Sequence, residues 1–221
     1  MNTVLVLAAH PDDELLGVGA TLARHVRSGD EAHAVVLSEG ASSRSRQGLA
    51  EQLAKSANRA AEVLGLSSID GWSLPDQRLD AIPLIDVVQR VEEVVDALRP
   101  DIVYTHFPGD VNTDHGIVAR AAWTACRPYV LPELRRFAVF ETPSSTEWAW
   151  PVDSAAFAPC LYADVTDTLE VKLEAMACYD TELRDYPHPR SLRALQERAA
   201  YWGSRVGRLA VEPFQVLREV W

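Results

Sequence analysis

The chain has 221 residues, of which 48% are hydrophobic, and its formal net charge is −11. This length suits one domain with a sizeable core, so we expect residues 1–221 to form a single domain. A strongly acidic chain is a poor partner for nucleic acid. No stretch approaches the roughly 20 apolar residues of a membrane-spanning helix, so we expect no membrane partner either.

The cysteines and the first residues indicate a cytoplasmic protein. Cys126, Cys160 and Cys178 are odd in number and show no Cys-x-x-Cys spacing, which is typical of reduced thiols. The start, Met-Asn-Thr, lacks the basic region of a secretory signal peptide, and the apolar run that follows is too short for one.

Strands and helices are expected to alternate along the chain. Strands are predicted at 4–9, 32–38, 69–72, 102–105, 137–141 and 161–165, and helices at 14–28, 47–64, 84–98, 117–126, 168–179 and 191–205. This alternation predicts an α/β fold of three layers, a Rossmann-like, doubly wound and mostly parallel sheet with helices on both faces.

The first strand runs into Ala-His-Pro-Asp-Asp-Glu at residues 9–14. Open α/β sheets bind ligands at the carboxyl ends of their strands. An imidazole and three carboxylates crowded there repel one another unless a cation lies among them, so the segment predicts a divalent-metal site. The alternative is that the acids only favour the positive end of the following helix.

Gly17 and Gly19 offer a different interpretation, a metal-free nucleotide-binding α/β module. The third glycine of a dinucleotide fingerprint is missing, and a pyrophosphate here would face the acids of residues 12–14. Close packing of the helix on the sheet is the better account of these glycines.

A second polar cluster follows the strand at 102–105, and it contains His106, Asp114 and His115. A catalytic zinc takes three protein ligands and leaves one position for water. His10, Asp13 and His115 meet that count. Asp12 then remains as a carboxylate that is close to the metal and able to take a proton.

These two clusters resemble motifs of the LmbE-like, or PIG-L-type, zinc N-deacetylases, which remove acetyl groups from N-acetylglucosamine units on various aglycones. The resemblance rests on Ala-His-Pro-Asp-Asp-Glu at 9–14 and Asn-Thr-Asp-His at 112–115. The blocks at 141–148 and 186–191 extend it along nearly the whole chain.

Carried over by position, the family's metal ligands fall on His10, Asp13 and His115, and its general base falls on Asp12. Asn112 is a departure, because studied members have a histidine three residues before the last ligand. Asparagine can donate a hydrogen bond to an oxyanion but cannot act as an acid near neutral pH.

The proton for the leaving amine then has three candidate donors, Asp12, His106 and His188. We favour His188 over His106, because its proline-flanked loop lies next to Arg190 and can close over the site. Asp114 is expected to orient a neighbour of the metal site.

Several residues are candidates for substrate binding. They are Arg44, Arg46 and Arg190, whose guanidinium groups suit an anionic substituent, and Glu141, Ser144 and Trp148, which offer polar groups and an aromatic face to a sugar ring. Each has an alternative: the arginines belong to solvated loops, and Trp148 suits a core or a homo-oligomer contact. For Asp76 we favour a turn begun by Pro75 over a role in a polar wall.

The sequence therefore predicts a zinc-dependent amidohydrolase that removes acetyl from a small-molecule N-acetylated amino sugar or its conjugate. Fe²⁺, Mn²⁺ and Co²⁺ suit the same ligands. Two alternatives stay open: a member that binds metal and a small molecule without hydrolysis, which Asn112 supports, and a hydrolase of a non-sugar amide.

Overall fold

The computed structural model describes residues 1–44, 46–150 and 156–221. In these residues a seven-stranded sheet has the order β3-β2-β1-β4-β5-β7-β6. The strands are β1 (Thr3–Ala8), β2 (Glu31–Ser38), β3 (Ser68–Leu74), β4 (Ile102–His106), β5 (Arg136–Phe140), β6 (Leu161–Asp164) and β7 (Val211–Glu219). From β3 to β5 every neighbouring pair is parallel, which confirms the expected α/β sheet.

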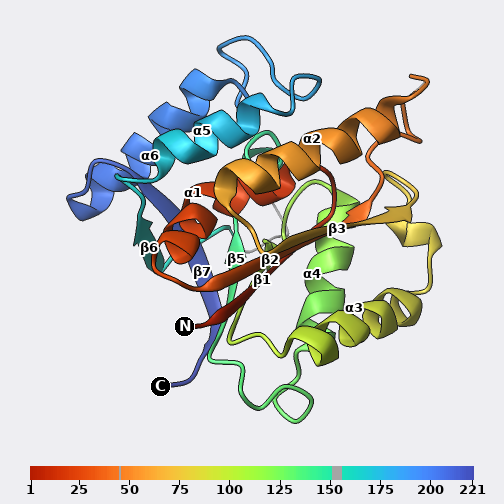
Figure 1. Cartoon of the computed structure of the whole chain (residues 1–221). Helices are drawn as coiled ribbons and strands as arrows, with labels where there is room; N and C mark the ends of the chain where they lie inside the picture. Colours follow the sequence, from red (N-terminus) through yellow and green to blue (C-terminus); the bar gives the residue numbers. More distant parts are fainter. Residues whose placement is uncertain (45, 151–155) are drawn as a thin grey trace.

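The helices cover both faces of this sheet, so the three-layer prediction is confirmed (Figure 1). On one face lie α1 (Asp13–Arg27), α2 (Leu49–Leu64), α5 (Leu169–Ala177) and α6 (Leu192–Val206), and on the other lie α3 (Leu84–Leu98) and α4 (Thr113–Ala125). Short 3₁₀ helices, η1 (Leu79–Ala81) and η2 (Thr146–Trp148), lie in the connections. None of the helices in the described ranges combines the length and the apolar character needed to cross a bilayer.

Strand β7 was not among the predicted strands. It lies between β5 and β6 and runs antiparallel to both. Pro213 interrupts its sequence, and a proline ordinarily argues against a central strand. Phe214, in the same strand, is fully buried, so tertiary packing outweighs this local signal.

Helix α4 begins at Thr113, four residues before the predicted start at residue 117. Asn112 is its N-cap, and the side-chain oxygen of Asn112 accepts a hydrogen bond from the backbone N–H of Asp114. This cap satisfies one of the unpaired N–H groups of the first turn. His115 therefore lies on a helix, where its position is fixed more firmly than in a loop.

The middle of the sheet is the best-buried part of the fold. The residues of β1 from Val4 onward are all buried, and apolar clusters fill the space on both sides of the sheet. Helix α1 lies very close to β5, because a Cβ atom added at Gly17 would come within 2.1 Å of the Phe140 ring. The first turn of α1 is thereby held against the sheet.

Candidate metal centre

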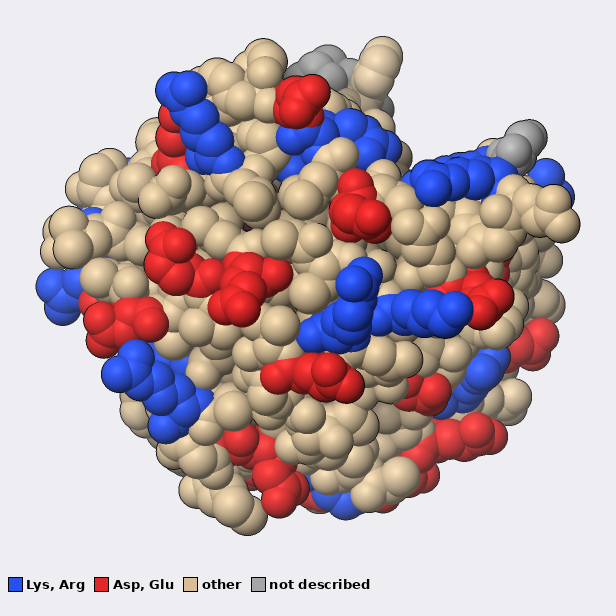
Figure 2. Space-filling model, turned by 45° about the horizontal axis from the view of Figure 1, so that its top comes forward, with Lys and Arg blue, Asp and Glu red and all other residues tan. Residues whose placement is uncertain are grey.

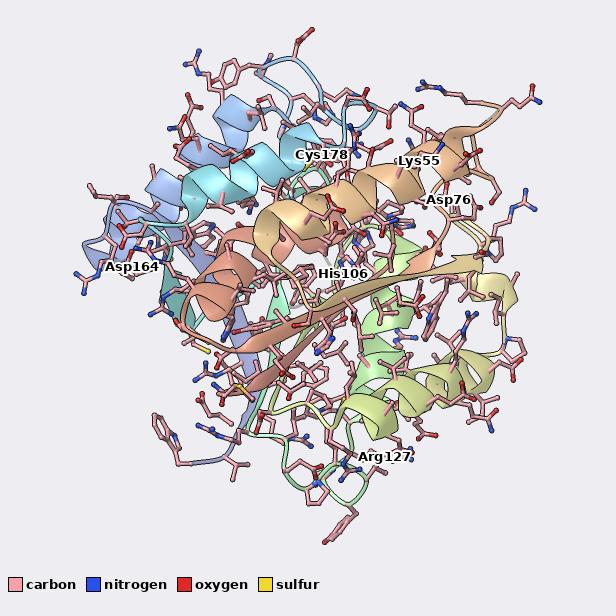
Figure 3. The ribbon with its side chains drawn as sticks, in the orientation of Figure 1. Lys55, Asp76, His106, Arg127, Asp164 and Cys178 are labelled. Atoms are coloured by element: carbon pink, nitrogen blue, oxygen red, sulfur yellow. The ribbon has the colours of Figure 1, made fainter. Side chains whose placement is uncertain are left out.

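The strand order brings the two polar clusters of the sequence together. Strands β1 and β4 are parallel neighbours, so residue 10 and the segment after residue 106 leave the sheet at the same edge. Figure 3 labels His106 at the end of β4 and Asp76 after β3. This is the edge where open α/β sheets bind their ligands.

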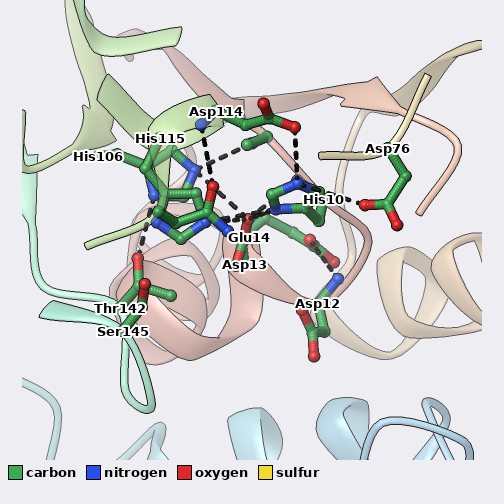
Figure 4. Close-up of polar contacts among 12 residues, drawn as sticks. His10, Asp12, Asp13, Glu14, Asp76, His106, Asp114, His115, Thr142 and Ser145 are labelled. Carbon is green, nitrogen blue, oxygen red and sulfur yellow. Dashed lines mark hydrogen bonds and ion pairs between the residues drawn. The ribbon is translucent and has the colours of Figure 1, made fainter. Parts of the chain in front are cut away.

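Three side-chain atoms form a compact triangle at this edge: Nδ1 of His10, Oδ2 of Asp13 and Nε2 of His115 (Figure 4). His10 and His115 each lie 3.2 Å from the Asp13 oxygen, and the two imidazole nitrogens lie 3.3 Å apart. Ligands at zinc distances of about 2.0–2.2 Å and tetrahedral angles lie about 3.4 Å from one another. The triangle therefore fits a small divalent cation.

The electrostatics of the triangle favour a cation. Burial alone would lower the pKa of His10, but hydrogen bonds to Asp114 and Asp13 raise it to about 10. Burial is likewise outweighed at His115, where Asp13 and Asp110 raise the pKa to about 9. Both rings are therefore positively charged beside these carboxylates. A metal ion at the same place would supply this positive charge instead.

Two further carboxylates hold the histidines from outside the triangle. Oδ2 of Asp114 lies 3.1 Å from Nε2 of His10, and its other oxygen accepts the backbone N–H of Leu79 at 3.0 Å. Oδ2 of Asp110 lies 3.2 Å from Nδ1 of His115, at an angle outside hydrogen-bonding geometry. Such carboxylate–histidine pairs fix the ring orientation in metal sites.

Asp114 was expected to orient a neighbour, and the structure places it beside His10. The contact between Asp110 and His115 was not anticipated, and its only sequence signal is an acid five residues before His115.

Asp12 lies beside the triangle and is held in an unusual backbone conformation. Its φ of 101° is in the region that favours glycine. Its backbone N–H donates to Oε2 of Glu14 at 3.1 Å, and the Tyr179 hydroxyl donates to the other oxygen of Glu14 at 2.7 Å. Burial, and after it the charge of Asp13, raises the pKa of the Asp12 carboxyl well above its usual range. Strained residues with shifted pKa values often mark functional sites.

His106 lies next to the triangle and is absent from the pocket wall. Its Nε2 accepts the backbone N–H of Ala9 at 2.9 Å, its Nδ1 lies 3.0 Å from the Thr142 hydroxyl, and its ring stacks on His115 at 3.9 Å. The pKa of His106 is lowered to about 3, mainly because the ring is buried. The ring is therefore neutral and supports His115 by stacking against it.

Besides His106 and Asp114, four predicted residues lie outside the pocket lining. The ring of His188 meets the exposed Trp148 edge-on, and neither lines the pocket. Glu141 is buried in a two-pronged ion pair with Arg198, with both N–O distances at 2.7 Å. Arg46 is exposed. The geometry therefore gives none of these four a direct contact with a molecule in the pocket.

The pocket itself has a volume of about 300 Å³ and includes the triangle and Asp12 in its wall. The rest of the wall consists mainly of polar and charged side chains. These residues are Leu16, Ser43, Arg44, Asp76, Gln77, Asn112, Thr142, Ser144, Ser145, Arg184 and Arg190. Asn112, Ser144, Arg44 and Arg190 are predicted site residues, whereas Asp76 and Arg184 were not expected there.

Asp76 corrects a preference made from the sequence. The segment does form a turn after β3, as expected from Pro75. The Asp76 carboxylate is nevertheless buried, accepts a hydrogen bond from the Ser43 hydroxyl, and lies 3.5 Å from Nε2 of His10. The turn and the polar wall are therefore two properties of the same segment.

Arginines lie along the pocket wall although the chain is acidic overall. Nη1 of Arg44 lies 2.7 Å from the buried Glu182, and Nη1 of Arg190 lies 3.3 Å from both Glu182 and Asp12. Arg184 donates to backbone carbonyls of its own loop and has no carboxylate partner among the described residues. In the space-filling view, basic and acidic side chains are intermingled on the surface, with several basic ones near the top (Figure 2).

Comparison with known proteins identifies the family. The model of the PIG-L family, described as GlcNAc-PI de-N-acetylase, matches residues 5–126, which is more than half of the chain. An uncharacterized deacetylase of Escherichia coli K12, YaiS, is 31% identical over 179 residues, which cover 78% of this chain and 88% of that protein.

Solved structures share the fold at lower sequence identity. The conserved protein TT1542 of Thermus thermophilus has a TM-score of 0.80 at 24% identity, covering 100% of this chain and 97% of that one. The N,N'-diacetylchitobiose deacetylase of Pyrococcus horikoshii has a TM-score of 0.78 at 20% identity, covering 98% and 84%. GalB, a 4-carboxy-2-hydroxymuconate hydratase of Pseudomonas putida KT2440, has a TM-score of 0.76 at 21% identity, covering 100% and 98%. The matched family model and the E. coli relative show that the chain belongs to the PIG-L (LmbE-like) family of hydrolytic N-deacetylases.

Proposed function

We propose that this protein is a zinc-dependent amidohydrolase that removes the acetyl group from an N-acetylated amino sugar or its conjugate. The observation that carries this proposal is the buried triangle of His10, Asp13 and His115 with the Asp12 carboxylate beside it, in a polar pocket. The family supports the reaction type, and the name of the chitobiose deacetylase with the same fold supports the sugar.

His10, Asp13 and His115 are the residues that would hold the zinc ion. A bound divalent metal supplies Lewis-acid character, which polarises the amide carbonyl and makes a water molecule a stronger acid. Fe²⁺, Mn²⁺ and Co²⁺ suit the same two nitrogens and one oxygen, so the assay below tests each metal in turn.

Asp12 acts as general base and then as general acid in this proposal. It takes a proton from the attacking water and passes it to the amine as the C–N bond breaks, which yields acetate and a free amine. A raised pKa suits a carboxyl that must both accept and return a proton. His106 is buried and His188 lies outside the pocket lining, which supports Asp12 over both as the proton donor.

Asn112 donates a hydrogen bond to the oxyanion in this proposal. Its side-chain oxygen is engaged by the N–H of Asp114 at 2.9 Å, so its amide nitrogen is the group left to donate to a ligand in the pocket. A preorganised donor at this position stabilises the charge that develops on the carbonyl oxygen.

The remaining wall suits the hydroxyl groups of a sugar ring. Asp76 offers acceptor oxygens, Arg44 offers donors, and Ser43 and Ser144 offer both. Arg184 adds a cation without a carboxylate partner among the described residues, which favours a substrate with a phosphate or carboxylate substituent. We further propose that residues 1–221 act as one domain in the cytoplasm, which the three unpaired cysteines support.

Binding without hydrolysis is the second candidate, and Asn112 is the observation that favours it. A fold alone does not fix the reaction, as GalB, named a hydratase, shows. The Asp12 carboxylate lines the pocket and is not one of the three predicted metal ligands, which argues for hydrolysis.

The test is acetate release from free, glycoside-linked and nucleotide-linked N-acetylhexosamines and from an N-acetylated amino acid. Each is assayed with protein loaded with one metal at a time and again after chelation. Metal-dependent release from a sugar supports the proposal. Release from the amino acid alone would replace the sugar by another amide. No release despite stoichiometric metal would favour the binding-only candidate.

A further inference from the structure

The pocket has one apolar wall that the proposed chemistry does not use. Leu16 is the single aliphatic hydrocarbon side chain among the described residues that line it. Leu16 follows Asp13 by three residues in α1, and residues at this spacing share one side of a helix. The residue is only 3% exposed. Leu16 therefore forms an apolar surface directly beside the reacting groups.

The substrate has one small apolar end that matches this surface. During hydrolysis the amide carbon must lie close to Asp12 and the three predicted ligands, and the acyl methyl group is bonded to that carbon. A methyl group gains free energy by contact with apolar surface and gains none from the charged groups elsewhere in the wall. The acetyl methyl group therefore fits against Leu16.

A second, smaller cavity lies directly behind Leu16. It holds about 20 Å³, and its wall includes Leu16, Gly17, Leu195, Ala199 and Trp202. A space of this size accepts about one water-sized group. Because Leu16 contributes to the walls of both spaces, this residue forms a partition between them.

The charged groups around the rear cavity are engaged with one another. Nζ of Lys172 lies 2.6 Å from Glu212, and the Arg198 guanidinium holds Glu141 at 2.7 Å. A hydrocarbon chain can therefore contact the apolar side chains of this wall without leaving a buried charge unpaired.

The backbone that carries the partition is fixed on both sides. The N–H of Leu16 donates to the carbonyl oxygen of Asp12 at 2.9 Å, and Lys172 donates to the carbonyl oxygen of Leu16 at 2.9 Å. Gly17 lies against Phe140 with no room for a side chain. The helix backbone is therefore held in place, and the size of the Leu16 side chain determines how far the partition extends.

We propose that Leu16 determines the length of the acyl group that this enzyme removes. It contacts the acetyl methyl group and closes the pocket behind it, so longer acyl chains are excluded from the rear cavity. The proposal rests on the proposed function, because it concerns the acyl group of the same reaction.

The test compares the wild-type protein with Leu16→Ala on N-acetyl-, N-propionyl- and N-butyryl-glucosamine. Leu195→Ala is the matched control, because it enlarges the rear cavity and leaves the partition in place. One methylene group in an apolar pocket changes kcat/KM by roughly 10–200-fold. We expect the butyryl-to-acetyl ratio of kcat/KM to rise at least about tenfold in Leu16→Ala and to stay unchanged in Leu195→Ala.

A binding measurement makes the test independent of turnover. Saturation-transfer NMR with acetate and butyrate should show acetate binding to the wild-type protein and butyrate binding only after the Leu16 side chain is shortened. Leu16→Val, which removes less volume, serves if Leu16→Ala does not fold, and it should admit propionate.

The outcomes separate the two proposals. An unchanged ratio in a folded Leu16 variant, or butyrate binding to the wild type as strong as acetate binding, would overturn the role of Leu16 and leave the deacetylase proposal intact. Absence of acetate release by the wild type, together with butyrate binding gained in the variant, would support the partition and overturn the reaction.

Discussion

Asp13 is the residue through which the charges of the site are coupled. Its Oδ2 accepts the backbone N–H of His10 at 2.9 Å and lies within 3.5 Å of the rings of His10, His106 and His115. Burial alone would raise the pKa of Asp13, but His115 and His106 lower it well below its usual range. A buried carboxylate that stays ionised beside two imidazoles is the donor set that a divalent metal needs.

Metal binding should release protons from this cluster. The pKa of His10 is about 10 and that of His115 about 9, so both rings are imidazolium cations at pH 7–8 in the metal-free protein. A metal ligand must be unprotonated, so affinity rises with pH and falls by up to about 100-fold per pH unit below pH 9. Calorimetry in buffers of different ionisation enthalpy should count about two protons released per metal. Binding with no proton release would contradict these pKa values.

Asp12→Asn separates catalysis from metal binding. The amide is close in shape to the carboxylate but takes no proton, so we expect kcat to fall by about 10²–10⁴-fold, the usual contribution of a general acid–base residue. Metal content, measured by elemental analysis, should match the wild type. Substantial remaining activity would show that another group is the base.

Asp114→Asn should affect metal binding rather than proton transfer. Asp114 touches His10 and not the pocket, so its loss weakens the orientation of a ligand rather than proton transfer. We expect metal affinity to fall by roughly 10–100-fold, measured by competition with a chelator of known affinity. The control is Asp70→Asn in β3, which leaves the triangle untouched. Equal metal affinity of the two variants would argue against the role of Asp114.

At the scale of helices and strands, local signals predicted most of the fold. The apolar runs of β1 and β4 and the amphipathic patterns of α2 and α3 are visible in short windows of sequence, and their bounds agree with the structure within a few residues. β7 and the first turn of α4 were missed. Pro213 masks the strand, and the dense polar residues before residue 117 look like a loop unless the Asn112 cap is recognised.

Gly17→Ala tests the close approach of α1 to the sheet. An added Cβ atom would lie 2.1 Å from the Phe140 ring, so one of the two must move. We expect the free energy of unfolding to fall by about 1–3 kcal/mol, the usual cost of overpacking a core. Urea denaturation of the metal-free protein measures it. Gly116→Ala in α4 is the matched control, because its nearest neighbour would be at 3.5 Å, and it should be neutral or stabilising by up to about 1 kcal/mol. Equal effects would refute the contact.

At the scale of the whole molecule, the last strand joins distant parts of the chain. β7 pairs with β5 and β6, and its Glu212 accepts the backbone N–H groups of Ala20 and Thr21 in α1 at 3.1 and 2.7 Å. The helix that carries Asp13 is thereby tied to residues almost 200 positions later. Strand β7 thus supports the site without contributing a side chain to the pocket lining.

A chain that ends at residue 209 should therefore lose cooperative folding. The truncation removes the buried Val211, Glu212 and Phe214 and leaves β6 without its partner strand. Circular dichroism during heating should show no sharp transition. A chain that lacks only the exposed Trp221 is the control and should unfold within about 0.5 kcal/mol of the full chain. Sharp unfolding of the shorter chain would show that β7 is dispensable.

The sequence by itself determined the α/β class, the two polar motifs and the family, because periodicity and short motifs are local properties of a chain. Only the tertiary structure decided how these motifs are used. It placed Asp114 and Asp110 against the two histidines, brought Asp76 into the pocket, buried His106 against His115 and turned Glu141 toward Arg198. Each of these contacts depends on which strands are neighbours and on which side chains compete for the same partner, and neither is encoded in any short window of sequence.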